Sequence, residues 1–187
     1  MKKLINVAMA SVLGLSVVGV SQASIPSNQG SGTVTFRGQI IDAPCSIAPE
    51  STNKVVEFGD LSTHVLTNGG KIVPFSIKLE NCDLAELKQK SGGKNTQKNI
   101  VNIAFTGSTV NSKPSMLSTT GGTGVGIMIS VPGEHSYINM NGTPTPTTAL
   151  MNGKNEISLE AVALAAEGDN VHPGAFNATA SFLLNYE

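Results

Sequence analysis

Hydrophobic side chains recur at every second position in several short segments of this chain, and this spacing constrains the fold more than any other feature. One such segment opens the region after the N-terminus, with Gly38 in the same register as three apolar residues, Val34, Phe36 and Ile40. Another closes the chain, from Phe176 to Tyr186. Residues two apart share a face of a strand but not of a helix. The pattern therefore predicts strands with one apolar face.

Turn signals separate further strand-like segments between these two. Strands are predicted at 54–58, 72–79, 100–105, 125–131 and 155–164, and a single capped helical turn is predicted from Asp83 to Lys90. The chain has no Trp and only six Phe and two Tyr against 20 Gly. A core of aliphatic side chains from many short strands fits this composition better than a helix bundle does. The fold class is predicted to be all-β, an antiparallel β-sandwich.

The first 23 residues have the features of a secretory signal peptide. Lys2 and Lys3 precede an apolar stretch from Leu4 to Val20, and Ser21-Gln22-Ala23 provides small residues for cleavage. A membrane anchor is the alternative, but this stretch is short and is interrupted by glycine and serine. The mature protein is therefore expected to be exported to an oxidising compartment.

The mature chain is expected to carry a small negative charge. Without Lys2 and Lys3, 10 of the 12 Lys and Arg remain against 13 Asp and Glu, which gives a net charge of −3. Nucleic acid and anionic membrane surfaces are poor partners for such a chain, and no direct membrane insertion is expected.

Cys45 and Cys82 are the two cysteines of the chain. In an exported protein they are expected to form a disulfide, which would close a loop of roughly 40 residues and stabilise the fold by about 3 to 4 kcal/mol. A metal site is the alternative, but no second pair of cysteines and no histidine at ligand spacing accompanies them. No metal or cofactor is predicted.

Catalytic motifs are not apparent in the sequence. The glycine-rich stretch from Gly121 to Gly126 matches neither a dinucleotide fingerprint nor a phosphate-binding loop, so a turn is predicted there. His64, His135 and His172 are scattered through segments that are predicted to be loops, without a nucleophile or paired acid at a recognisable spacing. An enzyme is not expected.

The two terminal segments suggest an intermolecular contact. The last strand has one apolar face and ends almost at the chain terminus, so a partner can reach its open edge. That face comprises Phe176, Ala178, Ala180, Phe182, Leu184 and Tyr186. Residues 24–41, here called the leading segment, follow the expected cleavage site. Pro44, just after them, indicates a break between this segment and the strands of the domain at 42–187. The leading segment is either the first strand of its own sandwich or a strand for another copy's groove.

Together these motifs resemble the pilins of the chaperone-usher family. The C-terminal signature of that family is an alternating strand with a penultimate Tyr and a Gly fourteenth from the end, and Tyr186 and Gly174 match it. Its N-terminal signature is an extension in which apolar residues alternate around a Gly, followed by a Cys. Val34, Phe36, Gly38, Ile40 and Cys45 match this second signature. Other local matches, which resemble major rod subunits of P pili, are 42–47, 58–62, 81–83 and 121–124.

The resemblance implies an incomplete immunoglobulin-like β-sandwich, the pilin fold, with six strands in place of seven. A periplasmic chaperone would fill the open groove first, and a neighbouring subunit's leading segment would replace it at an outer-membrane usher, a documented form of β-strand addition called donor-strand exchange. The protein would then be a homopolymeric fimbrial subunit outside a Gram-negative bacterium, most similar to a major rod subunit. A minor adaptor, a terminator and a carbohydrate-binding tip adhesin are the alternatives; such an adhesin would carry an additional domain before the pilin domain.

Overall fold

The computed structural model describes residues 32–38, 40–85, 99–134, 136–168 and 170–186. The chain divides into two units, residues 1–40 and residues 41–187, and each is described by itself. The expected signal peptide and most of the helical turn predicted from Asp83 to Lys90 lie outside the described residues. No helix in the described ranges is long and apolar enough to cross a membrane.

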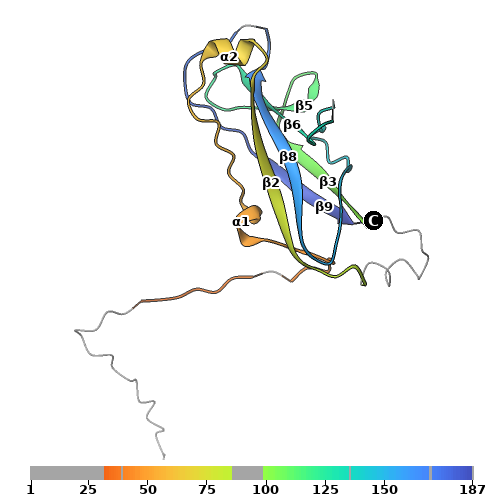
Figure 1. Cartoon of the computed structure of the whole chain (residues 1–187). Coiled ribbons are helices and arrows are strands. Elements are labelled where there is room, and N and C mark those ends of the chain that lie inside the picture. Colours follow the sequence, from red (N-terminus) through yellow and green to blue (C-terminus); the bar gives the residue numbers. More distant parts are fainter. Residues whose placement is uncertain (1–31, 39, 86–98, 135, 169, 187) are drawn as a thin grey trace, which may run out of the picture. The chain divides into compact units, whose positions relative to one another are not determined.

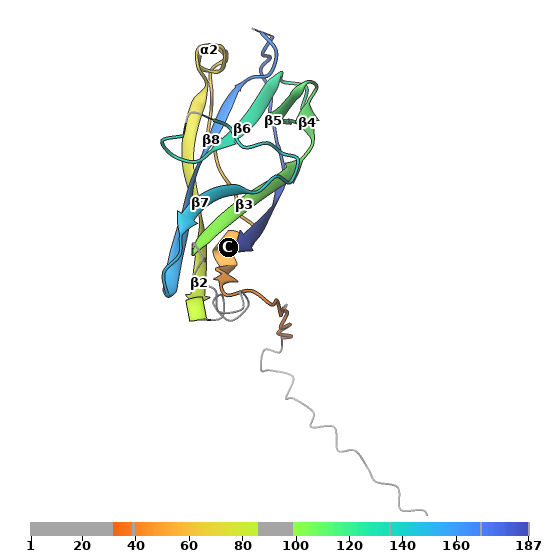
Figure 2. The ribbon, with the colours of Figure 1, turned by 90° about the vertical axis from the view of Figure 1, so that its right-hand side faces the viewer.

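The second unit consists of two antiparallel sheets that form two layers (Figures 1 and 2). The first sheet contains, in spatial order, β1 (Ser46–Ile47), β2 (Lys71–Cys82), β8 (Gly153–Ala165), β6 (Val125–Ser130), β5 (Lys113–Ser118) and β4 (Thr109–Val110). The second contains β7 (Thr145–Ala149), β3 (Ile100–Gly107) and β9 (Ala180–Tyr186). Every strand pair is antiparallel. The predicted all-β class and antiparallel arrangement are confirmed.

The core lies between the two sheets, where the alternation predicted it. Ile157, Leu159 and Ala163 of β8 are 0% exposed, and Val101 and Ile103 of β3 are also 0% exposed. These strands face each other across the layers, so their inward side chains form one cluster. Burying such side chains is the main favourable term in the folding of a sandwich.

The strand predicted at 54–58 is wrong, because this segment is irregular and belongs to no sheet. Its apolar residues divide between solvent and core: Val55 is 70% exposed, whereas Phe58 packs against the core. The segment and the first half of β2 line one pocket of about 450 Å³. Pro74 of β2, which also lines that pocket, has no N–H to donate to a ladder. Alternation in this segment therefore indicates which side chains face the core, but not whether the backbone pairs with another strand.

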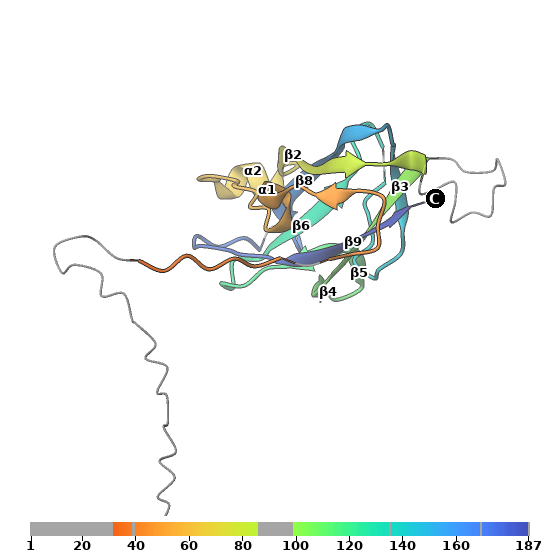
Figure 3. The ribbon, with the colours of Figure 1, turned by 90° about the horizontal axis from the view of Figure 1, so that it is seen from below.

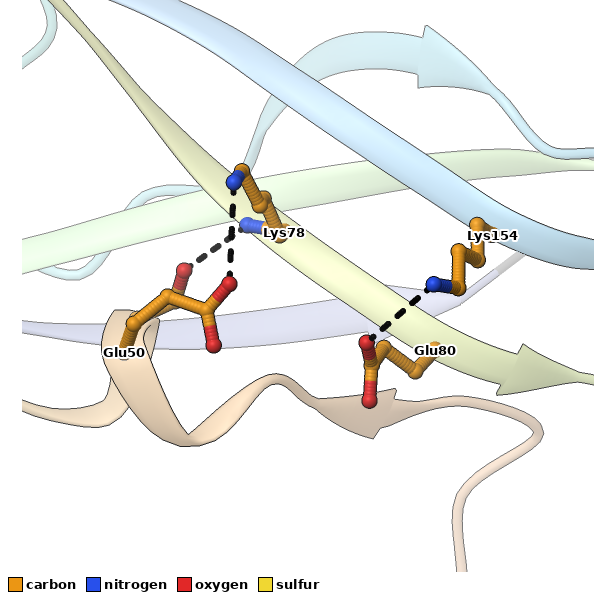
Figure 4. A network of polar contacts seen from close by, with 5 residues as sticks. Glu50, Lys78, Glu80 and Lys154 are labelled. Atoms are coloured by element: carbon orange, nitrogen blue, oxygen red, sulfur yellow. Dashed lines mark hydrogen bonds and ion pairs between the residues drawn. The ribbon is translucent and has the colours of Figure 1, made fainter.

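Two short helices flank this irregular segment, α1 (Pro49–Thr52) before it and α2 (Thr63–Thr67) after it. Ser51 of α1 is 0% exposed and its Oγ accepts a hydrogen bond from the backbone N–H of Lys78, at 2.9 Å. An exposed ion pair, Glu50 to Lys78 at 3.6 Å, lies beside this bond (Figure 4). Exposed ion pairs contribute little, so the buried Ser51 hydroxyl is the stronger link between α1 and β2.

The disulfide expected between Cys45 and Cys82 is present, and both residues are buried, with 2% and 5% exposure. The bond joins the start of the second unit to the end of β2. A backbone hydrogen bond from the N–H of Asp83 to the carbonyl of Pro44, 2.9 Å long, lies next to it. The two backbone segments are therefore held together by one covalent and one polar contact.

Candidate functional site

Strand β9 lies at the edge of the three-stranded sheet, on the side of the sandwich opposite β2 (Figure 3). It pairs with β3 from Ala180 to Tyr186, and its other edge has no strand partner in the described residues. The six apolar residues predicted to share one face all pack against the core, but each is only partly buried: Phe176, Ala178, Ala180, Phe182, Leu184 and Tyr186. The core is therefore incompletely covered along β9.

The segment that precedes α2 forms the opposite wall of this uncovered region. Residues 56–61 and residues 171–176 line a single pocket of about 480 Å³, here called the groove. The rings of Phe58 and Phe176, one from each wall, have centroids 6.1 Å apart. Leu66 and Val125, both buried, also line the groove. Apolar side chains from both walls therefore form part of its surface, and its volume leaves room for further side chains.

A glycine-rich turn holds the groove's second wall in place. A Cβ added to Gly121 would lie 2.1 Å from the carbonyl oxygen of Ala175, and one added to Gly124 would lie 2.0 Å from that of Asn170. Both glycines have positive φ, which other residues adopt only with strain. The turn predicted for this stretch is confirmed. The glycines are needed because the turn packs with its backbone directly against the backbone of residues 170–175.

Gly174, the glycine of the C-terminal signature, lies at the end of the groove. Its φ is +155°, and a Cβ at this position would be 3.2 Å from the Cγ2 methyl of Thr123. Both the backbone conformation and the neighbouring methyl group therefore disfavour a side chain here.

In the first unit, the leading segment exposes its apolar face. Val34 is 74% exposed, Phe36 is 90% exposed and Ile40 is 100% exposed. Residues 32–38 and residue 40 belong to no strand of the structure, although alternation predicts one. A Cβ added to Gly38 would meet no atom within 4 Å, so the extension itself does not require a glycine. Apolar side chains this exposed are typical of a surface that binds a partner.

Burial of Tyr186 makes the free energy of unfolding depend on pH. Burial raises the pKa of its phenol above the ordinary value, because the phenolate is less well solvated there. A folded-state pKa above that of the unfolded chain confers stability that is complete below about pH 10 and is lost as pH rises through the folded-state pKa.

We therefore expect the free energy of unfolding to fall more steeply above pH 10 in the wild-type protein than in Tyr186→Phe. Denaturant unfolding at several pH values from 8 to 11 measures the difference, and the phenylalanine variant controls for the titration of lysines. Parallel curves for the two proteins would contradict the burial of the phenol.

No group of three or more His, Cys, Asp and Glu side chains lies close enough to hold a metal ion in the described ranges. His64 and His172 are exposed, and His135 lies outside the described residues. Of the other predicted site residues, Gly174 lines the groove, Tyr186 ends β9, and the two cysteines form the disulfide.

Sequence reasoning missed one wall of the groove. The resemblance to rod subunits includes 58–62, but the sequence predicts a strand at 54–58 and does not predict that residues 56–61 lie opposite residues 171–176. Thr123 was also missed as a groove residue. The available signal was the phenylalanine and leucine of this match, Phe58 and Leu61, which face the core although they belong to no strand.

Comparisons with known proteins agree over nearly the whole chain. A family model described as fimbrial protein matches residues 34–187. The chain is 36% identical to the Pap fimbrial major pilin protein of Escherichia coli over 190 residues, covering 98% of this chain and 100% of that protein. A solved chaperone-usher pilus subunit, from work on rod uncoiling, has a TM-score of 0.74 and 38% identity, covering 88% of this chain and 99% of its own. The crystal structure of the P pilus rod subunit has a TM-score of 0.68 and 36% identity, covering 78% of this chain and 100% of that subunit.

Proposed function

The chain belongs to the fimbrial protein family, and we propose that it is the major rod subunit of a chaperone-usher pilus, in which each copy's leading segment fills the next copy's groove. The observation that carries this proposal is the incomplete cover of β9, whose apolar face packs against the core yet remains partly exposed. The sandwich, an immunoglobulin-like pilin fold, has space for one more strand along that edge.

The leading segment carries apolar side chains for this space. Val34, Phe36 and Ile40 recur at even spacing in the sequence and are largely exposed. Burying three such anchors contributes about 1.5 to 3 kcal/mol each, or very roughly 5 to 9 kcal/mol in all. Hydrogen bonds along the edge of β9 add to this, and ordering the segment opposes it. The balance favours a stable joint between copies.

Assembly then needs two further partners. An uncovered groove exposes core side chains, which promotes aggregation, so a periplasmic chaperone occupies it before assembly. An outer-membrane usher is the place where the neighbouring copy's leading segment replaces that chaperone. The product is a homopolymeric fimbria outside a Gram-negative cell, and it supports adhesion as a shaft without a catalytic role.

The rank of major rod subunit rests on full-length similarity. The relatives and the solved structures described above include a major pilin and a rod subunit, and each alignment covers nearly all of the other chain. A minor adaptor or terminator of the same fibre is the second candidate, because these subunits share the fold.

Electron microscopy with immunogold labelling distinguishes these ranks. We expect cells that lack this gene to lose their fibre shafts, and antibodies against the protein to decorate the shafts of wild-type fibres along their length. Label at the tips or the bases alone would contradict a major subunit and would favour the adaptor or the terminator.

A further inference from the structure

The second unit has two distinct ends. Helix α2 lies just before β2, and residues 171–176 lie at the same end, because they line the groove together with Leu66 of α2. The other end carries Cys45 and Cys82 with the start of β8, since Cys82 pairs with Gly153. Strand β2, 12 residues long, runs between the two (Figure 1). We call them the α2 end and the disulfide end.

At the disulfide end, Met151 is 68% exposed, yet its main chain is held firmly in place. The side-chain amide of Asn155 accepts a hydrogen bond from the N–H of Met151 at 2.8 Å and donates one to its carbonyl at 2.7 Å. Asn155 is buried, at 9% exposure, and a buried amide needs such partners. The fold therefore uses a buried polar group to fix the position of an exposed apolar residue.

Met151 lies beside the point where the leading segment joins the domain. The side chain of the next residue, Asn152, accepts a hydrogen bond from the N–H of Leu84 at 2.9 Å, and the residue before Leu84 donates its N–H to the carbonyl of Pro44. Ile41, three residues before Pro44, is 49% exposed. The disulfide end therefore carries two exposed apolar residues, Met151 and Ile41, near the start of the domain.

The short connection between the leading segment and its domain limits how far apart two joined copies can lie. Every strand pair in the structure is antiparallel, and a strand added antiparallel to β9 would have its C-terminal part at the Phe176 end of the groove, which is the α2 end. Cys45 is five residues after Ile40, and an extended chain of that length spans at most about 18 Å. The donor's disulfide end therefore lies next to the acceptor's α2 end.

We propose that Met151, together with Ile41, forms a second contact between consecutive copies, outside the groove, by packing against the α2 end of the copy that accepts the leading segment. This inference rests on the proposed function. The α2 end also carries exposed apolar residues, since Val65 of α2 is 37% exposed and Ile72, near the start of β2, is 54% exposed. Burying such side chains against one another is favourable, and the flexible methionine side chain adapts to an irregular surface.

Oxidation of methionine by hydrogen peroxide, followed by mass spectrometry, tests this contact. Met151 is exposed, whereas Met116, Met128 and Met140 are at most 8% exposed and serve as internal references. Copies purified as chaperone complexes are allowed to assemble briefly, the remaining grooves are filled with excess peptide of residues 24–44, and dimers are separated by size. Single copies whose grooves hold the same peptide are the reference without a neighbour.

In a dimer, the donor's Met151 faces the acceptor and the acceptor's own Met151 faces solvent. We expect half of the Met151 to oxidise at the rate of the single copies and the other half at least about tenfold more slowly, because oxidation follows exposure. A dimer has no contacts between successive turns of a shaft, so this protection belongs to the joint. Oxidation of all Met151 at the single-copy rate would overturn the inference alone. Failure to form dimers and to bind the peptide would overturn the proposed function as well.

Substitutions measure what the contact contributes. Met151→Ser should not change the denaturant unfolding of peptide-filled single copies, but its dimers should dissociate about fivefold faster in dilute denaturant. Met151→Leu keeps the apolar volume and should stay within about twofold of the wild type. Val55→Ser is the matched control, because Val55 is 70% exposed and lies beside the first half of β2, and its dimers should behave as wild type. Equal dissociation of wild-type and Met151→Ser dimers would contradict the second contact.

Discussion

Fibres are expected to be absent from cells whose only copy of the protein carries Gly38→Asn, although the variant still accumulates as a complex with its chaperone. Gly38 lies in register with the three anchors of the leading segment, so a side chain there would point into the neighbouring copy's groove. The groove walls approach closely, with the Phe58 and Phe176 ring centroids 6.1 Å apart. An asparagine would add bulk to the face that fills the groove and would bury an amide without a partner.

The chaperone complex is unaffected because it uses the variant's own groove, not its leading segment. Nothing in the extension itself requires a glycine at position 38, since a Cβ would meet no atom within 4 Å. Electron microscopy of the cells and co-purification with the chaperone measure the two outcomes. Arg37→Asn, on the opposite face of the same segment, is the matched control and should form fibres. Normal fibres from Gly38→Asn would show that the leading segment does not fill the groove as assigned.

Loss of the disulfide has the second largest expected effect. Cys45 and Cys82 are 37 positions apart, and a cross-link over such a loop stabilises the folded state by about 4 kcal/mol on the chain-entropy model. A domain of this kind has a total stability of about 5 to 15 kcal/mol, so this is a large share. We expect the Cys45→Ala, Cys82→Ala double variant to lose about that much in denaturant unfolding of the peptide-filled protein.

Reduction of the wild-type disulfide is the control for this pair of substitutions, because it breaks the same bond without changing side-chain volume. The two losses should agree within about 1 kcal/mol. A loss below about 1 kcal/mol in both experiments would mean that the hydrogen bond between Asp83 and Pro44, with the pairing of β1 and β2, already restricts the loop.

Alternation in the sequence predicted the inward faces of the long strands. Ile157 and Leu159 of β8 and Val101 of β3 are buried as expected. Side chains two positions apart share one face of a strand, and the apolar face must point into the core. Strand β7 escaped prediction because Thr145–Ala149 contains no large apolar residue and is a strand only through its pairing with β3. Strand β5 escaped because Pro114 interrupts its pattern.

The groove was harder to predict than the strands. The apolar face of β9 was evident from sequence, but both walls of the groove beside it, residues 56–61 and 171–176, are irregular and are defined by packing against the core. The place of Thr123 in the groove lining depends on contacts with residues about 50 positions away, His172 and Gly174, and no local pattern reports such a contact. Irregular backbone and long-range burial are the two features that single-sequence periodicity does not encode.

In a fibre assembled as proposed, tension reaches each subunit through its leading segment, and the first structure that resists it is the bond between Cys45 and Cys82. This bond carries the load directly into the end of β2, the strand that pairs with β8 over most of its length. The residues between the cysteines, including α1 and α2, are bypassed and cannot be peeled away from that end. A stretched shaft would therefore lengthen by parting contacts between copies, while the interior of each subunit stays intact.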